Sequence, residues 1–269
     1  MQTIQSLTTL SGSDPCREVI QRLDNIRKEF HELGRPAEAV VVGRAAVMLQ
    51  KDLSTQDPSE SEDALATLMY QLSFALYQSK YFTESCAVDE EAIAILRRLY
   101  ENDPVTHRAR LALALHNYAV HLPAAKRSEE AFAVHELCVK ISREQYALNP
   151  KECLDGLVWG LDNWGRDLIS HDRYAEARGV LDEGVCICRE WFKIDETHGP
   201  RFAESLRLYA LALRGLELSE QACEVGKECI ALCKRLYGQD QAKYRHYLEI
   251  AMNEQAVRLR SIGQLRKLT

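Results

Sequence analysis

Residues 115–138, LHNYAVHLPAAKRSEEAFAVHELC, contain the pattern that decides the fold. Large apolar residues surround a small one at Ala119, and two further small residues follow at Ala131 and Cys138, 12 and then seven positions later. Apolar residues at helical spacing on both sides of a short polar stretch predict two amphipathic helices joined by a turn. Small residues in these places predict that neighbouring helices approach each other closely.

The same arrangement returns along the chain every 46 residues, with a single step of 45. The small residue that opens the second helix recurs as Ala39, Ser85, Ala131, Ala177 and Ala222. Its follower recurs as Ala46, Ala92, Cys138, Gly184 and Cys229, and the first-helix residue recurs as Ser73, Ala119, Gly165, Ala210 and Ala256. Repeats of this length bury their apolar faces only against neighbouring repeats. We therefore expect an all-α solenoid of antiparallel helix pairs, with about five and a half repeats of 45–46 residues.

Proline-containing breakers mark the boundaries between the repeats, because proline cannot continue a helix and disfavours helical geometry in the residue before it. We expect a flexible tail over residues 1–14, a single repeat domain over 15–262 and a C-terminal tail over 263–269. The helical hairpins are predicted at 15–53, 61–101, 107–147, 152–194 and 201–237, followed by a capping helix at 241–262. This last helix either caps the array or precedes further chain, and we favour the cap.

Composition and charge indicate a soluble protein of the cytoplasm. The nine cysteines are an odd number without a disulfide framework, which favours reduced thiols. A net charge of −6 argues against a general nucleic-acid binder, and no apolar run approaches the about 18 residues of a membrane span. Residues 201–269 are the exception in charge, with 12 Lys+Arg against 8 Asp+Glu, a local +4. This excess suits an acidic partner, or it belongs to an ordinary solvated helical surface. The oligomeric state is not indicated.

The motifs of catalysis and cofactor binding are absent from the sequence. It has no His-Glu-x-x-His, no paired-cysteine zinc spacing and no glycine-rich phosphate loop. Cys188, Cys229 and Cys233 would form a three-thiol cluster if their helices met, but buried cysteines more often act as small core residues. We predict neither a catalytic residue nor a metal site, and no cofactor.

One row of polar residues is a candidate binding site. Two positions before the small residue of each first helix stand Asn25, Gln71, Asn117 and Asn163, at steps of 46. A side-chain amide both donates and accepts hydrogen bonds, so a row of amides suits an extended peptide backbone. The alternative is structural: the same amides could bridge adjacent helices.

The first helices carry a family resemblance in Leu115-x-x-Tyr118-Ala119-x-x-Leu122 and Leu161-x-x-Trp164-Gly165-x-x-Leu168. This spacing resembles the tetratricopeptide repeat (TPR), in the long form that is similar to kinesin light chain-like proteins of fungi and bacteria. The resemblance implies a right-handed superhelix whose first helices line a concave, peptide-binding groove. By this analogy, further groove-facing residues would be Tyr70, His116, Asp162, Arg166, Arg207, Arg214 and Arg260.

Two functions follow from the resemblance and from the negative search for catalytic motifs. The first is a non-enzymatic scaffold that binds a peptide or partner segment, possessing an acidic end, in the groove. The alternative is a sensor or regulatory fragment of a larger signalling protein, which oligomerises or gates an attached NTPase or protease domain.

Overall fold

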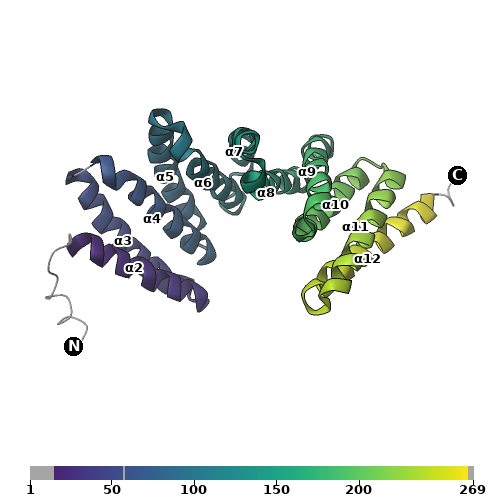
Figure 1. Cartoon of the computed structure of the whole chain (residues 1–269), viewed down its shortest axis with the longest axis horizontal. Coiled ribbons are helices and arrows are strands. Elements are labelled where there is room, and N and C mark those ends of the chain that lie inside the picture. The colour runs from purple at the N-terminus through teal and green to yellow at the C-terminus, as the bar shows by residue number, and fades with distance from the viewer. Residues whose placement is uncertain (1–14, 57, 266–269) are drawn as a thin grey trace. The chain divides into compact units, whose positions relative to one another are not determined.

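A computed structural model describes residues 15–56 and 58–265, and every secondary-structure element in these ranges is helical (Figure 1). The α-helices of these ranges are α2 (Pro15–Glu32), α3 (Pro36–Gln56), α4 (Pro58–Gln78), α5 (Phe82–Asn102), α6 (Pro104–Ala124), α7 (Ser128–Leu148), α8 (Pro150–Ser170), α9 (Tyr174–Ile194), α10 (Gly199–Gly215), α11 (Ser219–Gln239) and α12 (Gln241–Leu265). One short 3-10 helix, η2 (Glu196–His198), precedes α10. The predicted all-α fold is confirmed.

The chain divides into two compact units, residues 1–134 and 135–269, with the boundary inside α7. In the first unit each helix from α2 to α6 packs against the next one, and in the second unit α8 to α12 do the same. The predicted single domain over 15–262 stays a prediction. The predicted tail over 1–14 lies outside the described residues, and α12 continues to Leu265, past the predicted end of the capping helix.

Each helical hairpin turns at one residue in the left-handed region, and these residues keep the repeat register. They are Gly34 (φ 66°), Lys80 (φ 66°), Lys126 (φ 64°), Asp172 (φ 58°) and Glu217 (φ 61°). The next residue donates its backbone N–H to a carbonyl five residues earlier, as in Arg127 N to Leu122 O at 3.0 Å. This is the Schellman arrangement, which satisfies carbonyls at the end of the first helix.

The recurring small residues of α3 to α11 are buried, as their spacing predicts, whereas Ala256 on α12 is exposed. Ala119, Ala131 and Cys138 are 0%, 1% and 2% exposed. At Gly165 a side chain has no room, because an added Cβ would lie 2.4 Å from Cγ of Leu181 on α9. The register of small residues therefore marks the places where first and second helices touch.

No helix in the described ranges is at once long and apolar enough to span a membrane.

Candidate interaction surface

The four predicted amides lie on the first helices of four hairpins, in different surroundings. Asn25 is exposed and accepts a hydrogen bond from Gln21 at 3.3 Å, within α2. Asn117 on α6 and Asn163 on α8 are each only 7% exposed. Gln71 on α4 is half-buried. The amides therefore do not form one uniformly accessible row.

Two of these amides differ in whether the side-chain oxygen accepts a hydrogen bond. Asn163 Oδ1 accepts a hydrogen bond from Nη1 of Arg166 at 2.5 Å, so it already holds a neighbouring side chain. Gln71 Oε1 is buried and has no hydrogen-bond partner within the described part of the chain. An unpaired buried acceptor is costly unless something else donates to it. Gln71 is thus the amide whose buried oxygen stays unpaired among the described residues.

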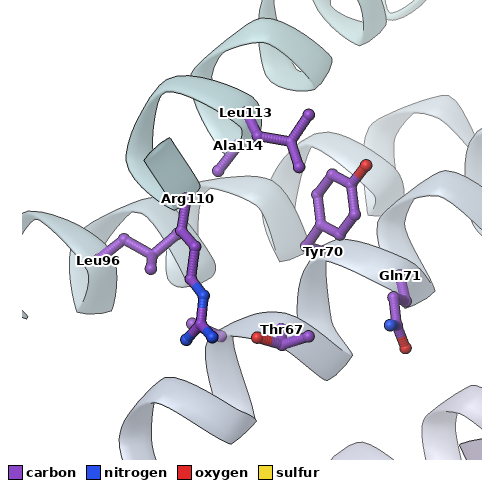
Figure 2. Close-up of a pocket in the computed structure, with 8 residues that line it drawn as sticks. Thr67, Tyr70, Gln71, Leu96, Arg110, Leu113 and Ala114 are labelled. Carbon is purple, nitrogen blue, oxygen red and sulfur yellow. The ribbon is translucent and has the colours of Figure 1, made fainter. Parts of the chain in front are cut away.

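Gln71 borders a small apolar pocket between α4 and α6 (Figure 2). The pocket has a volume of about 160 Å³, and its lining side chains are Ala66, Thr67, Tyr70, Gln71, Leu96, Arg110, Leu113 and Ala114. Tyr70 and Leu113 face each other across it, one from each first helix. This volume is below the roughly 300–1,000 Å³ of small-molecule sites. The pocket suits a single apolar side chain better than a cofactor.

The rim of this pocket is polar and leads into a second hollow. Arg110 pairs with Asp63, across the gap between α6 and α4. The second hollow, of about 400 Å³, shares Thr67, Gln71 and Arg110 with the first and is also lined by Ile20 of α2. The first helices α2, α4 and α6 therefore form one hollowed surface with an apolar centre.

In the second unit, a chain of ion pairs crosses the first helices. Arg166 on α8 contacts Glu204 on α10 at 2.9 Å, and Arg207 contacts the other oxygen of Glu204 at 2.8 Å. Arg207 also reaches Glu254 on α12 at 3.0 Å, and Glu254 binds the buried Arg258 at 3.0 Å. Two of the predicted groove arginines are therefore partly neutralised by neighbouring carboxylates.

The remaining predicted groove residues differ in how far their side chains are exposed to solvent. Arg214 on α10 and Arg260 on α12 are exposed, and neither has an ion-pair partner among the described residues. His116 and Asp162 are 3% and 1% exposed, so neither presents its side chain to a ligand in this structure. We keep the two exposed arginines and leave the two buried residues out of the candidate surface.

Asp162 has a structural partner instead. Both of its oxygens accept from the Ser205 hydroxyl, at 2.9 and 3.0 Å, in the contact between α8 and α10. Burial raises the pKa of the Asp162 carboxyl to about 7, because removal from water penalises the charged form.

Three buried residues of the first unit have the residue types of a hydrolytic triad. His121 Nδ1 lies 2.7 Å from Asp89 Oδ2 and 3.0 Å from Ser85 Oγ. A triad needs the serine at one imidazole nitrogen and the aspartate at the other, whereas here both approach the same nitrogen. All three side chains are at most 2% exposed, and Tyr77 stacks on His121. This cluster is a polar part of the core.

The cysteines considered as metal ligands lie in one core cluster of the second unit. Cys188, Cys229 and Cys233 are buried together with apolar neighbours. Within the described ranges, no group of three or more His, Cys, Asp or Glu side chains is arranged to hold a metal ion. All nine cysteines are free thiols, and burial raises the pKa of Cys188 to about 12.

Sequence reasoning missed several residues that shape these surfaces. Arg110 and Leu113 line the pocket, but no pattern in the sequence singles them out. Glu204 and Glu254 neutralise the groove arginines. Glu254 could have been found from the sequence, because it occupies the register position of the amide row on α12.

Comparisons with known proteins agree with this architecture. Residues 65–105 match the family model of the tetratricopeptide repeat. Kinesin light chain-like TPR repeats of Podosopora anserina have a similar structure, with a TM-score of 0.65, 16% identity, and coverage of 84% of this chain and 98% of theirs. A second crystal structure of those repeats gives 0.64 and 16%, covering 85% and 99%.

A third solved structure is less similar. BtubC (BKLC) from P. vanneervenii is 15% identical with a TM-score of 0.57, covering 85% of this chain and 92% of that one. None of the curated proteins matches the chain. At these identities the likeness shows the fold alone: tetratricopeptide-like helical repeats of the kinesin light chain type.

Proposed function

We propose that this chain, a tetratricopeptide-like repeat protein, is a non-enzymatic scaffold that binds a segment of a partner protein on its first helices. The fold generally mediates protein–protein interactions, and repeat proteins present extended surfaces for this purpose. The observation that carries the proposal is the pocket between α4 and α6, with the unpaired Gln71 oxygen at its edge.

In this proposal the partner segment inserts one large apolar side chain between Tyr70 and Leu113. When the half-buried Gln71 side chain turns toward the pocket, a donor of the segment, such as a backbone N–H, satisfies its Oε1. A buried apolar anchor flanked by a few oriented polar contacts is the usual arrangement of strong binding positions. In the second unit, the exposed Arg214 and Arg260 supply positive charge that suits an acidic segment.

The site of action in this proposal is a reducing, cytoplasmic compartment, because all nine cysteines are free thiols. The net charge of −6 favours protein over nucleic acid as the partner. No observation favours the alternative of a regulatory fragment that gates an attached catalytic domain.

Selection from a displayed random-peptide library tests the proposal. We expect the enriched peptides to share a large apolar residue, and Leu113→Arg to weaken their binding at least about tenfold by filling the pocket. Leu113 is 42% exposed, so the substitution is compatible with folding. The matched control is Met48→Arg on α3, a second helix, where the side chain is 61% exposed. Binding is measured by fluorescence anisotropy.

Gln71→Leu separates binding from structure. Removal of an acceptor that a ligand uses should cost about 0.5–1.5 kcal/mol of binding free energy, while the melting temperature should not fall, because the free protein loses an unpaired buried acceptor. An equal loss for Leu113→Arg and Met48→Arg would contradict the pocket. A Gln71→Leu protein that binds normally but melts much lower would show that the amide is structural.

A further inference from the structure

A pocket in the second unit repeats the one between α4 and α6. This α10–α12 pocket has a volume of about 180 Å³ and lies between α10 and α12, which are adjacent in the fold (Figure 1), with α11 contributing two residues. Seven of its lining residues stand 137 positions after a lining residue of the α4–α6 pocket, which is three repeat steps, two of 46 and one of 45. Three of these pairs are Ala66 and Ala203, Leu96 and Cys233, and Leu113 and Ile250.

The same seven register positions also line the hollow of about 400 Å³ between α2 and α4. Ile20, Gln50 and Thr67 occupy three of these positions there, 46 residues before their counterparts in the α4–α6 pocket. Hollows at one register position in both units show that the gap between successive first helices belongs to the repeat.

The α10–α12 pocket does not depend on where the array stops. In the first unit, α5 and α6 continue the array beyond α4, and the equivalent hollow between α2 and α4 stays open. Further helices after α12, packed as α5 and α6 are, would likewise leave the α10–α12 pocket open.

Side chains decide whether such a gap is open or closed. Between α8 and α10, Asp162, Phe202 and Ser205 occupy three of the seven positions and are at most 4% exposed. The Ser205 hydroxyl donates to Asp162 at 2.9 Å and joins the two helices there. In the α10–α12 pocket, Arg207 and Ile250 stand at the positions of Asp162 and Ser205, and the gap is open.

The α10–α12 pocket combines apolar walls with a charged pair. Tyr247 and Ile250 of α12 line it together with two buried cysteines of α11. Glu204 and Arg207 of α10 also line it and contact each other at 2.8 Å. Like the α4–α6 pocket, it is smaller than the roughly 300–1,000 Å³ of small-molecule sites. It therefore suits one apolar side chain.

The charge of the surrounding helices differs between the two pockets. α10 and α12 together carry seven Lys+Arg against three Asp+Glu, a net charge of +4. α4 and α6 together carry two Lys+Arg against three Asp+Glu, a net charge of −1. Acidic residues of a partner are therefore attracted to the α10–α12 pocket and not to the α4–α6 pocket.

We propose that the α10–α12 pocket is a second side-chain site, which takes an apolar residue flanked by acidic residues in a segment of a partner protein. This site extends the proposed first-helix function, on which it rests, by a second anchor with its own specificity. Because the helices around the two pockets have opposite net charge, the pockets select different partner sequences.

Selection from a displayed random-peptide library on the Leu113→Arg chain isolates this site, because that substitution fills the α4–α6 pocket. We expect the enriched peptides to combine an apolar residue with Asp or Glu beside it. Ile250→Arg, added to this chain, should weaken their binding at least about tenfold in fluorescence anisotropy. The matched control is Met252→Arg on the same helix, where the side chain is 51% exposed and does not line the pocket.

A second variant guards against misfolding of the Ile250→Arg protein. Tyr247 is 37% exposed, so Tyr247→Ala removes one wall of the pocket without placing a charge in it. This variant should weaken binding of the same peptides several-fold, while its melting temperature stays close to that of the Met252→Arg protein.

Amide versions of the selected peptides test the acidic preference. Replacement of each Asp by Asn and each Glu by Gln should weaken binding a few-fold, as is usual for exposed charge pairs, and the difference should narrow as NaCl rises. Peptides selected on an Ile250→Arg chain, which retains the α4–α6 pocket, should show no such preference for acidic residues.

Three results would overturn the proposal. The Leu113→Arg chain enriches no peptide although the Ile250→Arg chain does, or the enriched peptides bind the Ile250→Arg and Tyr247→Ala proteins as well as the Met252→Arg protein, or the amide versions bind unchanged. In the first case the α4–α6 pocket still binds its peptides, so failure of this site is distinct from failure of the proposed first-helix function.

Discussion

Four hairpin turns place a residue with a side chain in the left-handed region, where glycine is the least strained choice. Lys80, Lys126, Asp172 and Glu217 have φ between 58° and 66°, at the register position that Gly34 occupies in the first hairpin. For a residue with a Cβ this conformation costs roughly 1–2 kcal/mol. The chain therefore carries the same strain in four of its five turns.

Lys126→Gly should relieve this strain and raise the free energy of unfolding by about 0.5–1 kcal/mol, once the greater entropy of unfolded glycine is subtracted. Urea denaturation measures the change. The control is Lys126→Ala, which removes the charge but keeps the Cβ, and it should give no such gain. Equal stabilisation by alanine and glycine would mean that charge, not backbone strain, is responsible.

These turns also mark the limit of sequence reasoning at the scale of residues. Gly34 is recognisable, because glycine is common just past a helix end. Lysine and glutamate have no such preference, and that of aspartate is much weaker than that of glycine, so only the 46-residue register identifies Lys80 or Lys126 as turn residues. The Schellman hydrogen bonds form there because the next helix packs back on the first, which overrides the local preference.

At the scale of elements, the docking of α12 on α11 depends on one glycine. A Cβ added at Gly226 would lie 1.9 Å from Oε1 of Gln255 and 3.0 Å from Nη1 of Arg258, both buried on α12. Gln255 is held there by its hydrogen bond to the Cys223 carbonyl at 3.1 Å. The side-chain ends of Gln255 and Arg258 thus occupy the space beside Gly226, and a Cβ there would have to displace them.

Gly226→Ala should destabilise the protein by about 1–3 kcal/mol, the usual cost of overpacking a well-filled contact. Hydrogen exchange should show the loss of protection concentrated in α12. Gly179→Ala on α9 is the control, because nothing lies within 4 Å of its added Cβ. Alanine in an exposed helix interior should instead stabilise by about 0.5–1 kcal/mol. Destabilisation of equal size at both positions would refute this role of Gly226.

Helices and their contacts were predictable from the sequence, whereas the side-chain networks between them were not. Small residues in register are visible in the sequence, and their burial at Ala119 and Ala131 follows directly. The ladder from Arg166 through Glu204 to Arg207 depends on long side chains with many rotamers, which tertiary placement selects. The sequence contains these glutamates, but it does not show that Glu204 and Glu254 pair with the predicted groove arginines.

At the scale of the whole molecule, part of the candidate site was predictable from the sequence and part of it was not. The sequence placed Gln71 and Tyr70 on one first helix, and the structure puts both beside a pocket. The pocket itself arises from three helices, and Leu96 and Arg110 enter it from elements 25 or more residues away. The analogy with the resembled family also assigned His116 and Asp162 to the groove, although both are buried. A register specifies a face of a helix, but not how deeply neighbouring helices cover it.

The stability of the folded molecule should depend on pH through Asp162. Burial raises its pKa from the ordinary value of about 3.9 to about 7 in the folded protein. Between these values the folded state binds a proton that the unfolded state does not, so the free energy of unfolding falls as pH rises. The loss proceeds by about 1.4 kcal/mol per pH unit and is complete above pH 7.

Asp162→Asn should remove this dependence while retaining an oxygen to accept from the Ser205 hydroxyl. Urea denaturation of both proteins at pH 4.5 and pH 7.5 provides the comparison. Relative to the variant, the native chain should lose on the order of 3 kcal/mol over this interval. The buried Asp89, whose pKa is also raised by burial, is present in both proteins and cancels in the difference. The change of the unfolding free energy with pH is decisive here, because an altered hydrogen bond at position 162 shifts the values at both pH values equally. Parallel pH profiles would mean that Asp162 is already ionised in the folded state, stabilised by the nearby Arg166 and Arg201.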